Sequence, residues 1–543
     1  MLDVLIIGSG GAGLTAALAA KEMSTVEGVG QGNASILVVG KAYPTNSQTS
    51  MAQGGMNAAL GNVGEDHISS HIADTIKSAR GLCDEDMVRQ MCADAPKTIQ
   101  WLESIGVPFS RLDNGKSGVE TVAQRQMGGA SAKRACYAQD YTGLKILHTL
   151  YDTCLKENID FLDEHYLLNL ITEKTSTDTI IKGATFLDIR TGKVKQINAK
   201  SVILATGGYG SLYHGYTTNA YGSTGDGVAA VLRAGGAVSD MEFIQFHPTA
   251  LKGSSILISE SARGEGGYLV NSDGERFVDE LKPRDEVARA IFEQFQNDKE
   301  VFLDVRHIGV EKLMELLPQE VALCKLHEHI DPAKELIPIK PVAHYSMGGI
   351  DVDYALEVNG IKGCFAVGEC SNAKVHGANR LGGNSLLEIT AFGKFAGENA
   401  YKQAVYASNK EADETQLQRD TKEIEALYTK EDSLNFYTQR KALGKLFYEK
   451  VGIVRDNAQL TKAMEEVITM QVMAKKMGLS DKSSTNNTNL IDYLEFQNAL
   501  LLAPTIISAA IARDESRGAH YKVGFETQND EKFKQHIVLQ WKD

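Results

Sequence analysis

The sequence predicts an α/β protein in which a doubly wound parallel sheet is interrupted by an inserted α+β domain and followed by a helical C-terminal domain. A buried strand at 2–7, a helix at about 14–23 and a second buried strand at 36–39 form the βαβ unit of such a sheet. Short strands and helices at 236–348 break this alternation. From about Lys410 onward the chain is charged, helical in pattern and poor in glycine.

Chain length, composition and charge limit the class of protein. A chain of 543 residues is too long for one hydrophobic core, so two to four domains are expected. Hydrophobic residues make up 43% and charged residues 23%, which is typical of globular proteins. The net charge of -14 argues against binding nucleic acid or an anionic membrane surface. A small anionic substrate remains possible, because a local cationic pocket can lie within an acidic protein.

The chain shows neither targeting signals nor metal-binding cysteine pairs. A strand begins at Leu2 with no basic segment or twin arginine before it, so no secretory signal is expected. The most apolar stretch, Ala499 to Ala512, is shorter than the roughly 20 residues that span a bilayer, which predicts a buried helix. Seven cysteines form no CxxC pair. This excludes zinc ribbons, cysteine-ligated iron–sulfur clusters and c-type haem, and it indicates reduced thiols in a cytoplasmic protein.

The turn after the first strand carries a dinucleotide-binding pattern. Gly8, Gly10 and Gly13 match GxGxxG between a strand and a helix. Such glycines allow a tight turn, close approach of a pyrophosphate and close packing of helix on strand. The second strand ends in Gly40-Lys41, where an acid that binds a ribose is expected, so an ordinary NAD site is not favoured.

Two further segments bear on this sheet. Ser47 to Gly55 is small, polar and glycine-ended, and it suits either a surface turn or backbone lying close to a flat cofactor. Strand signals at 160–203 precede Ala205-Thr206-Gly207-Gly208, and the segment 364–369 predicts a return to the first sheet.

Eight motifs in order along the chain carry a family resemblance. The chain resembles the FAD-dependent flavoproteins of succinate dehydrogenase, fumarate reductase and L-aspartate oxidase. The motifs cover nearly its whole length: GSGGAG at 8–13, AQGG at 52–55, TGDG at 224–227, QFHPT at 245–249, RGEGG at 263–267, HYSMGG at 344–349, HGANRLGGNSL at 376–386 and ESRGAH at 515–520.

The resemblance implies three domains and a set of cofactor contacts. A Rossmann-like FAD-binding domain would span 1–235 and 350–405, with an α+β capping domain at 236–349 and a helical domain at 406–543. The FAD contacts would be Gly8, Ser9, Gly10, Ala12, Gly13, Lys41, Ser47, Gln48, Thr49, Gln53, Gly54, Gly55, Ala205, Gly207, Asp226, Glu369, Arg380, Ser385 and Leu386.

The same resemblance implies a dicarboxylate site, since fumarate needs cationic and hydrogen-bonding groups at both ends. His247 and Ser259 would hold one carboxylate, and His344 and Arg380 the other. Ser259 keeps the hydroxyl that many relatives carry on threonine.

The reaction implied is hydride transfer from flavin to one carbon and proton transfer from Arg284 to the other. Glu260 and Arg263 would resupply the proton, and their i, i+3 spacing puts them on one face of a helix. Arginine is normally never deprotonated, so this role requires transient transfer in a dry, positively charged site.

Position 48 separates this chain from many relatives. Succinate dehydrogenases and membrane fumarate reductases usually carry a histidine bonded to the flavin where this chain has Gln48. FAD is therefore expected to bind non-covalently, which favours the direction of fumarate reduction.

L-Aspartate oxidase, which also lacks a covalent flavin, is the alternative. Its usual glutamate before a Gly-Gly pair is Met127 here, and the segment Leu381 to Ser385 departs from its pattern. These features favour a dicarboxylate without an amino group. The segment Val451 to Arg455 looks more like the oxidase and keeps this alternative open.

A flavin-binding subunit without catalysis is a further alternative, against which the complete set of polar site residues argues. The family pattern implies electron exchange with an iron–sulfur subunit and, beyond it, a membrane-associated quinone- or thiol-reactive subunit. The chain would then lie in the cytoplasm, peripheral at the inner face of the membrane.

Overall fold

A central sheet organises the chain in the computed structural model. The structure describes residues 1–543 except 28, 30–31, 33, 114–119, 408–409 and 542–543. The sheet has the order β8-β2-β1-β11-β10-β9, with β18 also paired to β11. The β8–β2, β2–β1, β1–β11 and β11–β18 pairs are parallel, whereas β10 pairs antiparallel with its neighbours. The strands are β1 (Leu2–Ile7), β2 (Ile36–Val39), β8 (Asp160–Leu162), β9 (His165–Lys174), β10 (Thr179–Asp188), β11 (Val194–Leu204) and β18 (Cys364–Ala366).

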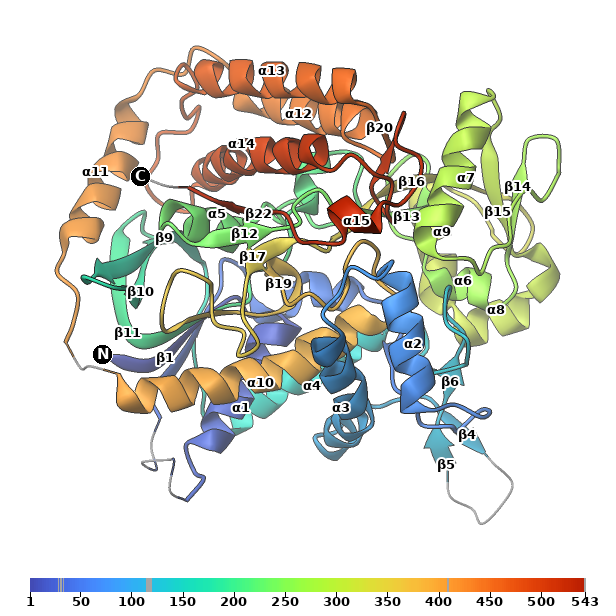
Figure 1. Cartoon of the computed structure of the whole chain (residues 1–543), viewed down its shortest axis with the longest axis horizontal. Helices are drawn as coiled ribbons and strands as arrows, with labels where there is room; N and C mark the ends of the chain where they lie inside the picture. The colour runs from blue at the N-terminus through green and yellow to red at the C-terminus, as the bar shows by residue number, and fades with distance from the viewer. Residues whose placement is uncertain (28, 30–31, 33, 114–119, 408–409, 542–543) are drawn as a thin grey trace.

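Helix α1 (Gly11–Met23) packs along α10 (Asn384–Tyr406), and the two lie side by side in Figure 1. Every residue of α1 from Gly11 to Ala20 is buried. A helix that is apolar on all sides is expected where a sheet and other helices enclose it. The central sheet and these two helices belong to the larger body of the protein. This body also contains β3 (Met56–Asn57), α2 (Ile68–Ser78), α3 (Glu85–Ser104), β4 (Arg111–Asp113), β5 (Glu120–Val122), β6 (Gln124–Arg125), β7 (Ala135–Cys136), α4 (Thr142–Lys156), α5 (Asp226–Arg233) and β19 (Ser371–Asn372).

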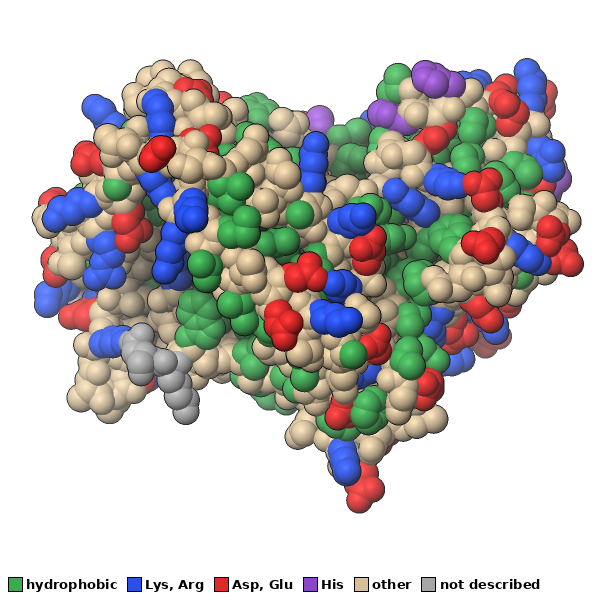
Figure 2. Space-filling view, turned by 90° about the horizontal axis from the view of Figure 1, so that it is seen from above, with side chains coloured by type: hydrophobic (Ala, Val, Ile, Leu, Met, Phe, Trp, Pro, Cys, Tyr) green, Lys and Arg blue, Asp and Glu red, His purple; other side chains and the backbone are tan. Residues whose placement is uncertain are grey.

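A second lobe projects from this body, at the right of Figure 1. It is built on a four-stranded sheet of order β13-β16-β15-β14 and has a separate hydrophobic core that includes Leu251, Leu269 and Leu303. Figure 2 shows the surface indented between this lobe and the larger body. The elements are β13 (Ile244–Leu251), α6 (Glu260–Gly264), β14 (Tyr268–Asn271), α7 (Arg284–Gln296), β15 (Val301–Asp304), α8 (Val310–Leu316), α9 (Pro318–His327) and β16 (Ile337–Ser346).

A small sheet connects the lobe to the body. Its order is β19-β17-β12-β22, so β12 (Ala237–Ser239) and β17 (Gly349–Asp351) pair with each other and not with the sheet of the lobe. β22 (Val538–Gln540), close to the C-terminus, adds to β12. The domain limits given above remain predictions, and these pairings show how closely the parts are joined at their boundaries.

The C-terminal region is largely helical and covers the body at the top of Figure 1. Helix α14 (Thr488–Ala512) contains the apolar stretch that was predicted as a buried helix, but it is longer than expected and accommodates Pro504 in its interior. By length and composition this one helix of the described chain could cross a membrane, yet 67% of its most apolar window is buried inside the protein. The elements are α11 (Thr415–Thr429), α12 (Phe436–Lys450), β20 (Val454–Arg455), α13 (Asn457–Ala474), α14 (Thr488–Ala512), β21 (Tyr521–Lys522) and α15 (Asp530–Phe533).

Candidate functional site

The glycine turn forms the floor of a cavity at the carboxyl end of the parallel strands. Gly8 has φ +115, and a Cβ there would lie 2.1 Å from the carbonyl oxygen of Ala205. A Cβ on Gly13 would lie 1.9 Å from the carbonyl oxygen of Gly8, so this glycine allows α1 to pack tightly on the turn. The first amide of α1, on Gly11, donates to Thr49 Oγ1 at 3.1 Å. The start of α1 therefore faces the cavity, as a pyrophosphate site requires.

Most residues predicted to contact FAD line this one cavity. Of the predicted FAD contacts, Gly13 is not among the lining residues and lies behind the turn. Arg263, which was predicted to take part in the proton chain, does not line the cavity either and lies behind Glu260. The predicted cofactor residues that do line it are Gly8, Ser9, Gly10, Ala12, Lys41, Ser47, Gln48, Thr49, Gln53, Gly54, Gly55, Ala205, Gly207, Asp226, Glu369, Arg380, Ser385 and Leu386.

The polar atoms of the cavity fit a flavin nucleotide. Ser47 Oγ, Thr206 Oγ1 and both amide atoms of Gln53 are buried and have no hydrogen-bond partner among the described residues. Buried polar atoms are nearly always paired in native proteins, and the donors and acceptors of a flavin nucleotide could satisfy these four. The segment Ser47 to Gly55, for which two interpretations were open, lies at the cavity and not in a surface turn.

Lys41 joins the lining of the cofactor cavity to the C-terminal region through ion pairs. Its Nζ lies 2.6 Å from Asp226 Oδ2 and 2.8 Å from Glu495 Oε1, which belongs to α14. Burial lowers the pKa of Lys41, but the two carboxylates outweigh burial and hold it above its usual value. Lys41 is therefore charged. It lies at the end of the second strand, where an acid that binds a ribose would be expected in an NAD-binding protein.

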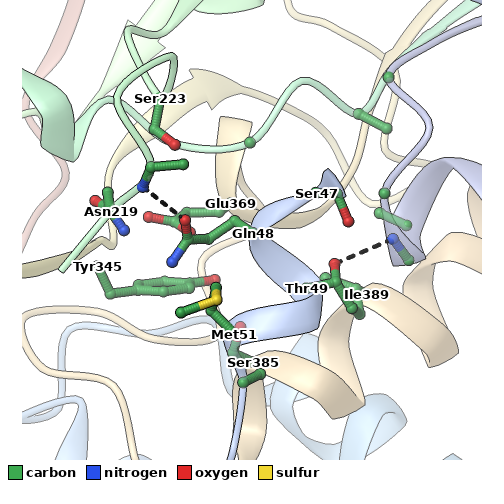
Figure 3. A pocket seen from close by; sticks show the side chains of 18 of the residues that line it. Ser47, Gln48, Thr49, Met51, Asn219, Ser223, Tyr345, Glu369, Ser385 and Ile389 are labelled. Atoms are coloured by element: carbon green, nitrogen blue, oxygen red, sulfur yellow. Dashed lines mark hydrogen bonds between the residues drawn. The ribbon is translucent and has the colours of Figure 1, made fainter. Parts of the chain in front are cut away.

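Gln48 projects into the cavity in Figure 3, and its Oε1 accepts a hydrogen bond from the N–H of Ala220 at 2.9 Å. Glu369 lies in the same view and accepts hydrogen bonds from Ser346 N–H and Oγ, each at 3.0 Å. Burial raises the pKa of Glu369 to about 7.

Two histidines and a serine come together in the same cavity. The rings of His247 and His344 lie 4.9 Å apart, and both residues line the cavity with Ser259. Burial, and then the positive charge of Arg284, hold both histidine pKa values well below 6.5. The imidazoles are therefore neutral. His344 Nδ1 lies 2.7 Å from Thr218 Oγ1, which orients the ring.

A buried ion pair lies beside these histidines. Arg284, the first residue of α7, contacts Glu260 Oε2 through Nε at 2.9 Å and through Nη2 at 2.6 Å. Glu260 Oε1 accepts from Gly128 N–H at 2.9 Å and lies 3.7 Å from Arg263 Nη2. Burial raises the pKa of Glu260, but Arg284 and Arg263 outweigh this effect and lower it below its usual value. The three side chains form a continuous buried chain of charges.

Arg380 is a buried cation without an acidic partner. Its guanidinium stacks on Tyr345 at 4.3 Å, and among the described residues no carboxylate forms an ion pair with it. Burial and the repulsion of Arg284 lower its pKa to about 10. Burying an unpaired charge is costly, so this arrangement favours binding of an anion in the cavity.

Some site residues were missed from the sequence. Gln245 Oε1 accepts from Arg284 Nη1 at 3.1 Å, while its Nε2 donates to the carbonyl of Arg380 at 2.8 Å. Gln245 thereby fixes the two arginines relative to each other, and Tyr345 supports one of them. Both residues belong to motifs that carried the resemblance, which was the available signal.

A Rossmann-like sheet whose cofactor cavity continues into a buried cationic pocket defines a flavin-dependent oxidoreductase. The FAD binding domain family matches residues 3–386, and the fumarate reductase flavoprotein C-terminal family matches residues 440–543. The chain belongs to the family of FAD-binding flavoprotein subunits of fumarate reductase and succinate dehydrogenase.

Individual relatives match over nearly the whole chain. The fumarate reductase flavoprotein subunit of Escherichia coli is 37% identical over 99% of this chain and 91% of its own length. The 8-methylmenaquinol:fumarate reductase flavoprotein subunit of Wolinella succinogenes is 38% identical over 99% of this chain and 88% of its own length. A solved quinol–fumarate reductase chain superposes with a TM-score of 0.91 at 36% identity, over 99% and 95% of the two chains. The predicted family, fold class and cofactor are confirmed.

Proposed function

We propose that this chain interconverts fumarate and succinate, with fumarate reduction as the favoured direction. The observation that carries the proposal is the unpaired, buried guanidinium of Arg380 in the same cavity as Arg284, His247 and His344. Two cationic groups and two neutral imidazoles suit an anion with a carboxylate at each end. The names of the relatives support the same substrate pair.

Each end of the substrate has its own partners in this proposal. His247 and Ser259 bind one carboxylate, and His344 and Arg380 bind the other. The neutral imidazoles donate hydrogen bonds without adding charge, so the arginines supply the electrostatic attraction. When bound, FAD would supply the hydride chemistry, and Gln53 and Gly54 are among the cavity residues that would hold it.

The proton is proposed to come from Arg284. Its guanidinium lines the cavity, and Glu260, which lines the same cavity, contacts the guanidinium through Oε2. Glu260 returns a proton to Arg284 and receives one from Arg263. The repulsion between Arg284 and Arg380 favours loss of a proton from this cluster, because removing one of two buried like charges relieves it.

Aspartate fits the cavity less well than fumarate. Met127 is buried at the cavity wall and offers no charge to an ammonium group. Glu260, which accepts from the N–H of Gly128 next to Met127, is already engaged by Arg284. A buried ammonium would therefore lack a free partner.

FAD is proposed to bind without a covalent bond, because an amide at position 48 cannot form the histidyl linkage. Relatives named as subunits of quinol-linked complexes support an iron–sulfur partner here, with a membrane-associated quinone- or thiol-reactive subunit beyond it. The chain would then be peripheral at the inner face of the membrane.

Steady-state assays with the purified chain test the proposal. With reduced viologen as donor, fumarate should be reduced. With a dye as acceptor, succinate should be oxidised more slowly and aspartate hardly at all. Aspartate turnover equal to succinate turnover contradicts the proposal.

A further inference from the structure

The backbone N–H of Ser259 donates a hydrogen bond to a carboxylic acid side chain of the second lobe. Ser259 is the N-cap of α6, and its hydroxyl lines the cavity. Its N–H donates to Glu320 Oε1 at 2.8 Å, with Ser259 2% and Glu320 4% exposed. The hydroxyl itself bonds to Ser261 within the same turn. Glu320 thus fixes where α6 begins and where the Ser259 hydroxyl lies.

The position of Glu320 is in turn fixed by a contact between the second lobe and the body. It lies in the first turn of α9, where backbone amides have no partner within the helix. Asp140, which precedes α4 in the FAD-binding body, accepts from the N–H groups of Gln319 and Glu320 at 2.8 and 3.1 Å. An anion at this end of a helix is also favoured by the helix dipole. The contact therefore runs from Asp140 through α9 to Ser259.

We propose that Glu320 is a positioning residue for the Ser259 hydroxyl, and that Asp140 holds Glu320 in place across the contact between the body and the second lobe. This inference rests on the proposed function, since it concerns the hydroxyl that would bind a substrate carboxylate. Glu320 does not line the cavity and takes no part in the proton chain. Its effect on the reaction is exerted through Ser259.

The electrostatics of the cluster support this role at neutral pH. Burial raises the pKa of Glu320 to about 8, and Asp140 adds to the increase. Besides Asp140, the charged and titratable groups near Glu320 are Arg125 of the body and Cys324 of the lobe. Tyr137 and Glu265 in turn neighbour Arg125.

The sign of the pH dependence follows from that raised pKa. At pH 7 Glu320 is neutral and lies beside Asp140 without repulsion. As the pH rises through about 8, the ionised carboxylate repels Asp140, and Arg125 offsets this only in part. The contact with Asp140 should weaken in that range. The ionised carboxylate still accepts from the Ser259 N–H, so Glu320 should carry Ser259 with it as it shifts away from Asp140.

Two substitutions at position 320 separate the positioning of Ser259 by Glu320 from a contribution of Glu320 to the stability of the whole protein. Glu320→Ala removes the acceptor of the Ser259 N–H and should raise the KM for fumarate about tenfold, with kcat changed less than threefold. Glu320→Gln keeps an acceptor oxygen but cannot ionise. It should keep the wild-type KM at pH 7 and abolish the rise in KM that wild type shows above pH 8. Glu315→Gln on exposed α8 removes a nearby carboxylate and is the matched control.

Hydrogen exchange in the absence of any dicarboxylate tests the contact separately from the reaction. Asp140→Ala should speed exchange of the Gln319 and Glu320 amides at least tenfold and raise the KM in the same direction as Glu320→Ala. If wild type fails to reduce fumarate but these amides behave as described, the proposed function is wrong and the contact stands. Unchanged exchange in Asp140→Ala, or the same KM rise above pH 8 in Glu320→Gln as in wild type, overturns the inference. If Glu320→Ala does not fold, the pH profile of Glu320→Gln decides.

Discussion

Arg284 and Glu260 form a buried pair in which two guanidinium nitrogens, Nε and Nη2, contact one carboxylate oxygen at 2.9 and 2.6 Å. The remaining nitrogen, Nη1, bonds to Gln245. The guanidinium is therefore fixed in one orientation at the cavity, as a proton donor must be, and it adjoins an acid that could reprotonate it.

Arg284→Gln should lower kcat for fumarate reduction by about 100- to 10,000-fold, the usual contribution of general acid catalysis. Binding of FAD and of a dicarboxylate should persist, because Arg380 and both histidines remain. Viologen-linked turnover and flavin difference spectra measure the two effects. Arg289→Gln, one turn along α7 and outside the cavity, is the control and should retain most activity.

FAD should be released when the protein is denatured, because Gln48 cannot form a histidyl–flavin bond. Denaturing electrophoresis should give a protein band without flavin fluorescence, and the yellow cofactor should pass through a filter after acid precipitation. A fluorescent band would show that another residue attaches the flavin.

Met127→Glu should weaken fumarate binding, because it places an anion at the cavity wall beside a dianionic ligand. Met127→Gln, of similar size and without charge, is the matched control. Titration of flavin absorbance with fumarate should show an increase in Kd of at least about tenfold for the glutamate variant alone. Equal effects of both variants would point to shape and not charge.

Lys41→Met should destabilise the protein and weaken FAD binding, because it leaves Asp226 and Glu495 buried without their cation. Breaking a fully buried pair costs about 3–5 kcal/mol, and we expect the lower end since Lys41 is 29% exposed. Denaturant unfolding and FAD titration measure the loss. Lys200→Met, which breaks a 2.7 Å pair with Asp3 away from the cavity, should cost less.

Local patterns predicted much of this architecture. The glycine turn and its flanking strand and helix are determined by neighbouring residues, so their positions follow from the sequence. Motif order likewise indicated that His247, Ser259, Arg284, His344 and Arg380 belong to one site, and all five line one cavity.

Long-range contacts could not be predicted in the same way. The pairing of β22 with β12 joins residues about 300 positions apart and leaves no local periodic signal. Likewise, nothing near Lys41 indicates that its partner is Glu495 on α14. The length of α14 was underestimated, because polar residues at its start hide a helix whose buried face is set by the body beneath it.

The cavity is proposed to deliver a hydride and a proton to fumarate. Anaerobic stopped-flow mixing of the reduced flavoprotein with fumarate tests it most directly. We predict that flavin absorbance near 450 nm returns at a rate that saturates with fumarate concentration, and that Arg284→Gln slows the saturated rate at least about 100-fold. Reduced wild-type flavin that stays reduced in excess fumarate would contradict the claim.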